Sequence, residues 1–542
     1  MLRPLTLLAL AAPPAWPQCG TSGVDLVVAD LTAITVFSTS GGVTALMPGV
    51  AICNLGTAPA SWSATSAAHP AVLFTLYRYA TDGGRGRFEA LGQSWVHHQS
   101  SALQQALCCV CTPGALQQLG AGCSTTSSAS AVGQQSQLGL RVSVDPQTGA
   151  FDWPLSAPPP AGSADRRLQV ASADLAVPNA RYFLEAQVVS GDDAASGQRA
   201  NNASYREVLV GAGPVFTYVG ATVVGQPAVT VWPALDPNAA VVTSTVPGEG
   251  GTLRLGYAVT DVGDGWHAYE YVLHDLDSLA GARSFAIAIP PGVQVRGLGF
   301  VGAATHSGDP VDDAPWAASL AGGILTFATD GHAVQPLANG LRAGSAFTLR
   351  FEASAPPQPG PILVSRFRPG TPDAWIVNAL APAPVGPGAF CFGDGSGAAC
   401  PCANTSAVGA GEGCRNSLGS GARLARSGLP SVSNDTFMLH GSGMPNSSVL
   451  YFQGTSAAGG GAGTIFGDGL RCAAGSVVRL GTTTNLDGAS SHPGPGSLPV
   501  SVAGLVTAGA THVYQVWYRN AAAFCTASTF NLSNGIAATW VP

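Results

Sequence analysis

The chain has 542 residues and a formal net charge of −7; 46% of its residues are hydrophobic and only 10% are charged. This composition excludes wholesale disorder, because enough apolar side chains are present to fill cores, and the lack of a basic patch argues against nucleic acid as a partner. All 23 basic residues are arginines, which excludes chemistry that depends on a lysine, such as Schiff-base formation.

Residues 1–18 are predicted to be a cleaved signal peptide. A basic start at Arg3 precedes an apolar run at residues 5–12, which is too short to span a bilayer, since that needs ~20 residues. Cys19 follows, but residues 16–18 lack the small side chains of a lipid-attachment signal, so we expect a disulfide rather than a lipid there. The protein is therefore expected to be secreted or to lie at the cell surface.

Twelve cysteines form two groups of six around a long cysteine-free stretch. Even-numbered groups in an exported chain predict structural disulfides. Frequent Gly and Pro between short apolar runs predict an all-β fold class. We expect three consecutive antiparallel β-sandwich-like domains at residues 19–213, 214–388 and 389–542, of which the outer two are crosslinked by disulfides. The first group is Cys19, Cys53, Cys108, Cys109, Cys111 and Cys123, and the second is Cys391, Cys400, Cys402, Cys414, Cys472 and Cys525.

In the first segment, strands are predicted at residues 24–31, 50–57 and 72–79, and alternating polarity predicts that the last of these is half-buried. Residues 181–189 and 201–208 are predicted to form a hairpin around a long polar loop. The adjacent cysteines Cys108 and Cys109 are awkwardly spaced for a tetrahedral zinc site, so disulfides are preferred to zinc.

The order of several short motifs in this segment is similar to that in the catalytic domain of lysyl oxidases, which are copper amine oxidases of β-sandwich type. The resemblance covers about a third of the chain and implies the β-sandwich scaffold of that family. The motifs are Val24-Asp25-Leu26-Val27, Asn54-Leu55-Gly56-Thr57, His69 before the aromatic strand 74–79, Gly122-Cys123, the acidic pair Asp192-Asp193, and Asn201-Asn202.

The residues that would carry lysyl oxidase chemistry are missing. His69 is the single histidine in the matching stretch, and His97 and His98 are neighbours on a predicted strand, where adjacent side chains point to opposite faces. The family cofactor is a quinone built from a lysine and a tyrosine, but this chain has no lysine and no tyrosine directly after Gly122-Cys123. The resemblance therefore implies a shared scaffold without the amine-oxidase reaction.

In the middle segment, residues 253–260 and 268–275 alternate as strands around Gly263-Asp264-Gly265, which predicts a tight hairpin turn. Seven or so short strands in this segment predict a β-sandwich. The acidic loop 306–313 is either a Ca²⁺ site or a solvated turn, and its irregular spacing favours the turn. The aromatic residues Trp266, Tyr269 and Tyr271 are either a sugar-stacking face or a packed core with one exposed ring, and the core is favoured.

The third segment opens with four cysteines in a glycine-rich stretch that needs crosslinks to be ordered. Residues 392–395 and 466–469 both read Phe-Gly-Asp-Gly, and tight turns are predicted at both. We expect Cys472 to pair with Cys525 and the four earlier cysteines to pair among themselves. The segment resembles C-terminal modules that recur in large exported bacterial proteins of unknown function, through Cys-Phe-Gly-Asp-Gly at 391–395 and Ala-Cys-Pro-Cys at 399–402.

No complete catalytic motif is present in the sequence. There is no G-x-S-x-G elbow, and His440, His492 and His512 lie isolated on strand or loop sequence. We therefore predict no catalytic, cofactor-binding or metal-binding residues and no cofactor.

The expected function is that of an exported non-enzymatic β protein for extracellular structure, adhesion or glycan binding. Its expected partner is a surface glycan or another extracellular polymer, and it is not expected to span a membrane. The alternative is a secreted enzyme, either a hydrolase or a metal-dependent oxidase with a rearranged site.

Overall fold

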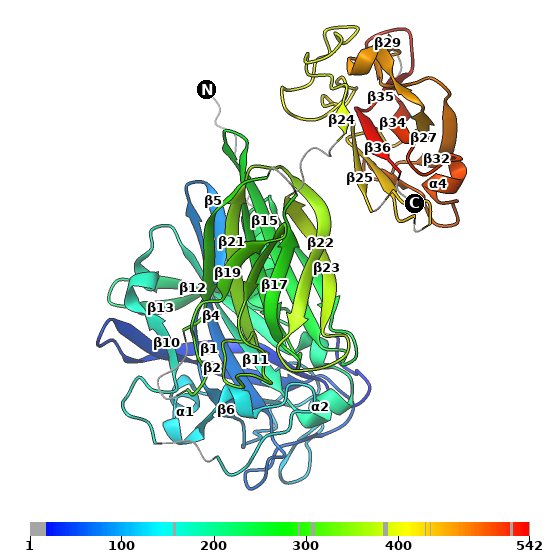
Figure 1. Ribbon diagram of the computed structural model, residues 1–542. Coiled ribbons are helices and arrows are strands. Elements are labelled where there is room, and N and C mark those ends of the chain that lie inside the picture. The colour runs from blue at the N-terminus through cyan, green and yellow to red at the C-terminus, as the bar shows by residue number, and fades with distance from the viewer. Residues whose placement is uncertain are drawn as a thin grey trace, which may run out of the picture. The chain divides into compact units, whose positions relative to one another are not determined.

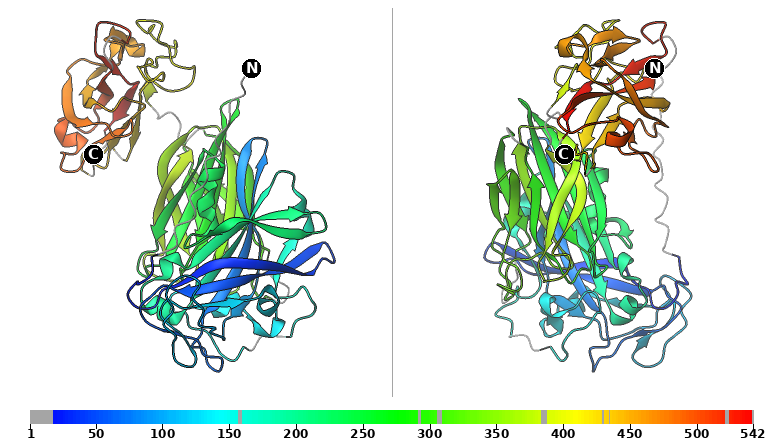
Figure 2. Two further views of the ribbon diagram at one scale, coloured as in Figure 1. Left: turned by 180° about the vertical axis from the view of Figure 1, so that it is seen from behind. Right: turned by 45° about the vertical axis from the view of Figure 1, so that its right-hand side comes forward.

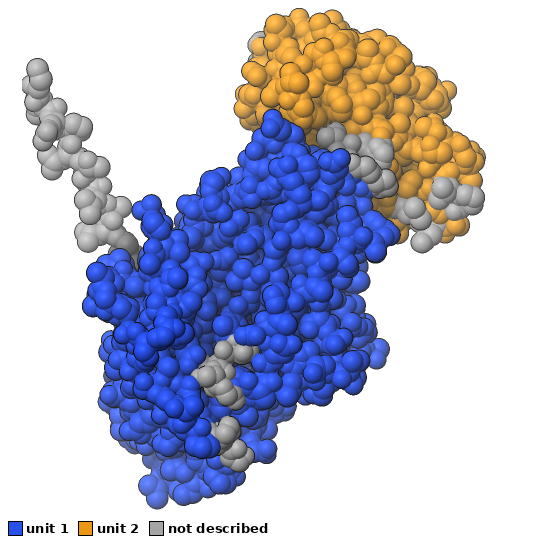
Figure 3. Space-filling view, turned by 60° about the vertical axis from the view of Figure 1, so that its left-hand side comes forward, with its two compact units in different colours: residues 1–382 blue, residues 383–542 orange. Residues whose placement is uncertain are grey.

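The computed structural model describes residues 18–155, 159–290, 293–304, 309–382, 388–428, 430–433, 435–520 and 524–540. The predicted signal peptide, except for residue 18, lies outside the described residues. Contacts divide the chain into two compact units, Met1–Pro382 and Ala383–Pro542, which Figure 3 shows in different colours. Both units are built from antiparallel sheets, which confirms the predicted all-β fold class. The α-helices have only four or five residues and are α1 (Ala129–Val132), α2 (Gly191–Ala195), α3 (Trp232–Leu235) and α4 (Val500–Ala503).

The first two sheets of unit 1 come from the N-terminal part of the chain. The first sheet has the order β1 (Leu26–Ser38), β2 (Val43–Asn54) and β10 (Leu168–Ala171), with β8 (Ser124–Ser127) also paired to β2. The second sheet has the order β13 (Val215–Val223), β12 (Ala203–Gly211), β11 (Arg181–Val189), β4 (Ala71–Asp82), β6 (Val96–His98) and β9 (Leu138–Gly139), with β5 (Arg85–Gln93) paired to β4. A short ribbon pairs β3 (Ala60–Ser61) with β7 (Gln118–Leu119).

The third and fourth sheets come from the cysteine-free segment and have five strands each. The third has the order β14 (Ala239–Thr245), β15 (Thr252–Gly263), β16 (Trp266–Asp275), β21 (Ser345–Ala353) and β18 (Val295–Gly302). The fourth has the order β19 (Ala317–Ala321), β20 (Ile324–Ala328), β17 (Ala282–Ala288), β22 (Pro357–Arg366) and β23 (Ala374–Pro382).

These four sheets are stacked one on another (Figure 1 and Figure 2), and three apolar cores lie between them. Ile52 of the first sheet packs in one core with Phe74 of the second. Tyr77, on the opposite face of β4, belongs to a second core that contains Val272 of the third sheet. Tyr271 of the third sheet shares the last core with residues of the fourth. Residues 71–77 of β4 are therefore buried on both faces, and the prediction of a half-buried strand at 72–79 is wrong.

The boundary predicted between residues 213 and 214 falls inside a hairpin. Strands β12 and β13 pair directly across it, with Gly211 opposite Val215, so the second sheet continues to Val223. Because the third sheet then packs on the second, the N-terminal and cysteine-free segments share a core and belong to one compact unit.

Two hairpins agree with the sequence prediction. Strands β15 and β16 pair as far as Gly263 and Trp266, and the two turn residues have positive φ, 52° at Asp264 and 77° at Gly265. Positive φ at both central residues is typical of the type I′ turn, whose twist matches that of the strands. Strands β11 and β12 also pair, and the polar loop between them contains α2.

Unit 2 is a smaller sandwich. Its main sheet, the fifth, has the order β24 (Ala389–Phe390), β36 (Gly535–Thr539), β34 (Thr511–Arg519), β27 (Ser448–Gly454) and β32 (Val478–Thr484), with β35 (Phe530–Leu532) paired to β34. The sixth has the order β25 (Arg423–Ser427), β26 (Met438–Ser442) and β33 (Ser490–His492). Two short hairpins pair β28 (Ser456–Ala457) with β31 (Ala473–Ala474) and β29 (Thr464–Phe466) with β30 (Gly469–Arg471). The core between the fifth and sixth sheets contains Leu439, Tyr451 and Tyr514.

All twelve cysteines form disulfides, as predicted, but the expected pairing in the third segment is wrong. Cys472 pairs with Cys391 instead of Cys525, and both lie in one buried cluster with Leu470. Of the bonds expected among the four earlier cysteines, Cys400–Cys414 is present. The full set of bonds is Cys19–Cys109, Cys53–Cys108, Cys111–Cys123, Cys391–Cys472, Cys400–Cys414 and Cys402–Cys525. The cysteines 108, 109, 111 and 123 are thus engaged in disulfides and are not zinc ligands.

Candidate functional site

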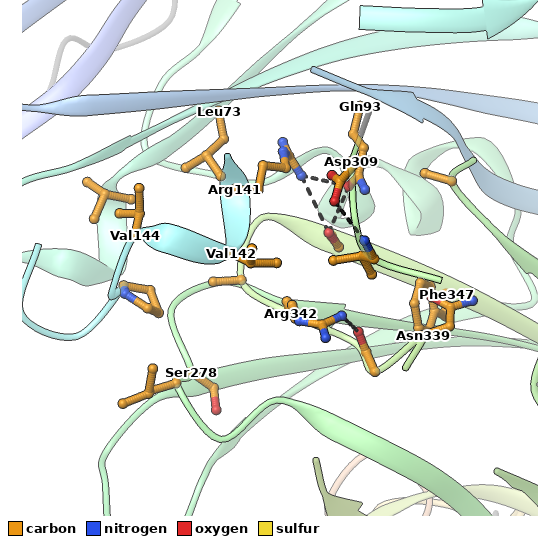
Figure 4. Close-up of a pocket in the computed structure, with 18 of the residues that line it drawn as sticks. Leu73, Gln93, Arg141, Val142, Val144, Ser278, Asp309, Asn339, Arg342 and Phe347 are labelled. Carbon is orange, nitrogen blue, oxygen red and sulfur yellow. Dashed lines mark hydrogen bonds between the residues drawn. The ribbon is translucent and has the colours of Figure 1, made fainter. Parts of the chain in front are cut away.

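One candidate site in unit 1 is a cavity of about 70 Å³ where the second and third sheets meet (Figure 4). Its wall combines apolar side chains such as Leu73 and Phe347 with three arginines, Arg141, Arg342 and Arg368, and the carboxyl group of Asp309. This volume is well below the ~300–1,000 Å³ of typical ligand sites, so the cavity has room for a few waters or one small anion.

Arg141 ties the second and third sheets together from within this wall. Its guanidinium donates to the carbonyl oxygen of Ser94 at 2.7 Å and to Oε1 of Gln93 at 2.7 Å, and across the layer to the carbonyl oxygen of Gly344 at 3.1 Å. Burial lowers its pKa to about 10, so the group stays charged at neutral pH. Because the N–H donors of Arg141 already have protein partners on both sheets, the main role of this side chain is to link the two sheets.

Asp309 shows where the acidic loop of the middle segment lies, although residues 305–308 of that loop are outside the described residues. Its Oδ1 accepts from the backbone N–H of Val311 at 3.0 Å, and its carboxyl group lines the cavity. Burial raises its pKa above the ordinary value. The predicted solvated turn is therefore only partly right, because Asp309 faces the protein, whereas Asp312 is exposed.

The histidines of the first segment do not fit a copper centre. Nδ1 of His69 donates to the carbonyl oxygen of Ser66 at 2.7 Å, which leaves its Nε2 to accept from Nδ1 of His98 at 3.3 Å. The two imidazoles therefore bind each other, and a copper ion would need at least one further ligand. Within the described residues no group of three or more His, Cys, Asp or Glu side chains could hold a metal ion.

The aromatic cluster of β16 is a packed core, as favoured from the sequence. Tyr269 and Tyr271 are fully buried and their rings stack with centroids 6.5 Å apart. Trp266 is partly exposed, but the guanidinium of Arg296 covers its ring at 3.8 Å, and Arg296 in turn pairs with Glu352 at 2.6 Å. This surface therefore offers no open ring for a sugar.

The arrangement closest to a catalytic one was missed from the sequence. His440 is not isolated: its Nε2 lies 2.7 Å from Oγ of Ser427 and its Nδ1 lies 2.8 Å from Oγ of Ser491. The three residues come from adjacent strands β25, β26 and β33, and only their register could have brought them together. A hydroxyl takes the place that a carboxylate holds in a Ser-His-Asp triad, so the imidazolium formed during catalysis would lack a fixed negative partner. Burial lowers the pKa of His440, which disfavours that imidazolium further.

Comparisons with known proteins give no family for this chain. No family model matches it, and no curated protein matches it. Among solved structures, an alpha-2-macroglobulin of Escherichia coli activated by porcine elastase aligns over 95% of this chain and 35% of its own, at 10% identity and a TM-score of 0.13. The full-length major pilin RrgB of Streptococcus pneumoniae aligns over 73% of this chain and 57% of its own, at 12% identity and a TM-score of 0.14. This chain thus spans about a third and just over half of those two chains, and at these scores neither alignment carries an argument.

Among the residues that the structure describes, there is also no helix with the length and apolar character needed to cross a bilayer.

Proposed function

We propose that the chain is an exported, non-enzymatic β protein that serves extracellular structure, adhesion or glycan binding. The observation that supports this proposal best is the complete pairing of all twelve cysteines. Six disulfides are stable in oxidising compartments and are rare in the reducing cytosol. They cluster in loops with little regular structure, such as residues 99–123 and 391–414, where few sheet hydrogen bonds could hold the backbone.

The proposal is tested by expressing the full chain in a secreting bacterial host and assaying the medium, the periplasm and the cell surface. The mature protein is expected outside the cytoplasm, without residues 1–18 and with no thiol that reacts under denaturing conditions. Recovery in the cytoplasm with free thiols would overturn the proposal. A variant that lacks residues 1–18 is the matched control and is expected to stay in the cytoplasm.

A second candidate function, a secreted hydrolase, has one observation in its favour, the Ser427–His440–Ser491 cluster. If Ser427 were an activated nucleophile, a fluorophosphonate probe would label it, and the label would disappear in Ser427→Ala and in His440→Gln. The non-enzymatic proposal expects no such label, with the unrelated surface variant Ser396→Ala as the control. Labelling of Ser427 that depends on His440 would favour the hydrolase.

We further propose that residues 19–213 keep the scaffold of lysyl oxidases without their reaction, and that residues 389–542 are a reusable extracellular module. The missing lysine and the mutual contact of His69 and His98 support the first part. Copper titration followed by an amine-oxidase assay tests it: stoichiometric copper binding with peroxide release from a primary amine would contradict it.

A further inference from the structure

The outer face of the fifth sheet in unit 2 carries an open groove of about 570 Å³. Side chains that alternate along β27, β32 and β34 point to the core on one face and into this groove on the other. Thus Tyr518 and Val516 are buried in the core, whereas Trp517 lines the groove. The hairpin β29–β30 contributes Phe466 and Arg471 to the groove wall.

The floor and one wall of the groove are aromatic. Trp517 contacts Phe530 with ring centroids 5.4 Å apart, and Phe530 contacts Phe466 at 4.9 Å, so the three rings form one continuous group. Phe466 is 42% exposed and Val477, at the rim, is 41% exposed. Large apolar side chains left this open on a folded sheet are typical of binding surfaces.

Three arginines surround these rings. The guanidinium of Arg519 lies over Trp517 at 5.2 Å and that of Arg471 over Phe466 at 6.0 Å, which restrains both planar groups against the aromatic wall. Arg519 donates through Nη1 to Thr529 at 2.7 Å and Arg471 through Nε to the carbonyl of Ala473 at 2.9 Å. Arg479 is exposed on β32. Within the described residues none of the three arginines forms an ion pair.

Among the residues of unit 2 that the structure describes, no Asp or Glu lines this groove, so no carboxylate there neutralises its arginines. Asp468 lies between the groove residues Phe466 and Arg471 in the sequence, but it is fully buried. Its carboxylate accepts from Asn520 at 3.1 Å and from the backbone N–H of Thr526 at 2.9 Å. Unit 2 as a whole has six arginines and five acidic residues, a formal charge of +1, in a chain whose total is −7. The groove is therefore a local positive region on an acidic protein.

We propose that this groove binds a carboxylate-bearing saccharide chain, such as a polymer of uronic acids. Arginine forks bind carboxylates through two parallel hydrogen bonds, and each of the three guanidinium groups has N–H donors left for this. The apolar faces of the sugar rings would pack against the exposed part of Phe466 and against Val477 at the rim, beside the arginines. The hollow is within the range of ~300–1,000 Å³ that ligand sites occupy. The inference rests on the proposed extracellular role and names its ligand class.

A single-stranded nucleic acid also combines stacking rings with negative charge, but the protein fits it less well. Nucleic-acid sites track a backbone with many basic side chains, whereas this groove has three and the chain as a whole has a formal charge of −7. A polymer with one carboxylate on each ring matches three arginines spaced among aromatic side chains better.

The test is isothermal titration calorimetry of the oxidised full chain with tetragalacturonate. The controls are its methyl ester, which keeps the rings and removes the charge, and an oligothymidylate. The key variant is Arg479→Gln, because Arg479 is exposed and its loss disturbs no ion pair within the described residues. Its matched control is Arg415→Gln, which removes another exposed arginine of unit 2 that does not line the groove.

We expect tetragalacturonate to bind, with about tenfold weaker binding in Arg479→Gln, the effect of losing one charge-assisted hydrogen-bond pair. Arg415→Gln should bind as wild type, and the methyl ester at least tenfold more weakly. Absence of binding by a folded chain without free thiols would overturn the groove proposal but leave the extracellular role standing. Equal binding of the methyl ester, an equal loss in Arg415→Gln, or tighter binding of oligothymidylate would each overturn it as well.

Discussion

The substitution Trp232→Ala tests whether the four sheets of unit 1 form one cooperative body. Trp232 is fully buried between the second and third sheets, with its ring centroid 6.2 Å from that of Phe88. The third sheet approaches the indole at Gly256, where a Cβ would lie 3.0 Å from the ring. The side chain therefore fills the layer that joins the N-terminal segment to the cysteine-free segment.

The expected cost follows from the area that the indole buries. A buried tryptophan removes ~150–250 Å² from water, and at ~25 cal/mol per Å² this contributes about 4–6 kcal/mol. Nε1 of Trp232 has no hydrogen-bond partner in the described residues, so its removal returns about 1 kcal/mol of desolvation cost. The net loss of unfolding free energy should be about 3–5 kcal/mol, which is also the usual range for Trp→Ala in cores.

Urea unfolding followed by near-UV circular dichroism measures this loss. The control is Trp266→Ala, which changes a tryptophan of strand β16 in the third sheet. Trp266 lies at the surface beneath Arg296, so its loss should cost only about 1 kcal/mol. Unit 1 should unfold in a single transition that Trp232→Ala shifts as a whole. The reasoning is refuted if both variants cost the same, or if unit 1 shows two transitions in addition to that of unit 2 and Trp232→Ala moves only one of those two.

Two further predictions concern pH and disulfides. Burial lowers the pKa of His97 to about 4, so between pH 6.5 and 4 the unfolded chain binds a proton that the folded chain does not, and the unfolding free energy decreases as the pH is lowered through this range. Between pH 7 and 5 the wild type should lose about 2 kcal/mol more unfolding free energy than His97→Gln, and equal slopes would contradict this. Cys402→Ser with Cys525→Ser opens a bond across 123 residues, and should cost about 2 kcal/mol more than Cys400→Ser with Cys414→Ser across 14 residues, because longer loops lose more entropy on closure. Equal melting temperatures of the two double variants would count against this entropic account.

Local pairing could be predicted from the sequence, but the stacking of the sheets could not. Gly263-Asp264-Gly265 specifies its own turn, and the β15–β16 hairpin formed where it was expected. By contrast, Thr75 interrupts an apolar strand and indicates a solvent-facing side. In the structure its hydroxyl donates to the carbonyl oxygen of Gly344 at 3.0 Å, on the neighbouring sheet. A polar residue that faces a second sheet has the same sequence pattern as one that faces water.

The same limit explains what was missed at the candidate sites. The cysteine pairs depend on which strand ends meet, and Cys391 and Cys472 are 81 residues apart. The Ser427–His440–Ser491 cluster depends on the register of three strands. The groove on unit 2 could be predicted in part, because residues 511–519 alternate between core and outer face, but Phe466 comes from a hairpin whose place no local pattern specifies.

The distribution of cysteines follows from how each segment buries its strands. The cysteine-free segment contributes the third and fourth sheets of unit 1, which have five strands each. The third sheet is covered on both faces, so sheet hydrogen bonds and apolar cores hold this segment without crosslinks. The N-terminal segment and unit 2 carry long loops that leave the sheets. In unit 2 these loops, held by Cys391, Cys400, Cys414 and Cys472, cover one end of the outer face of the fifth sheet. The other end of that face stays open as the groove, with Trp517 at the junction of the two. The disulfides of unit 2 therefore stabilise the module and also set the limit of its proposed binding surface.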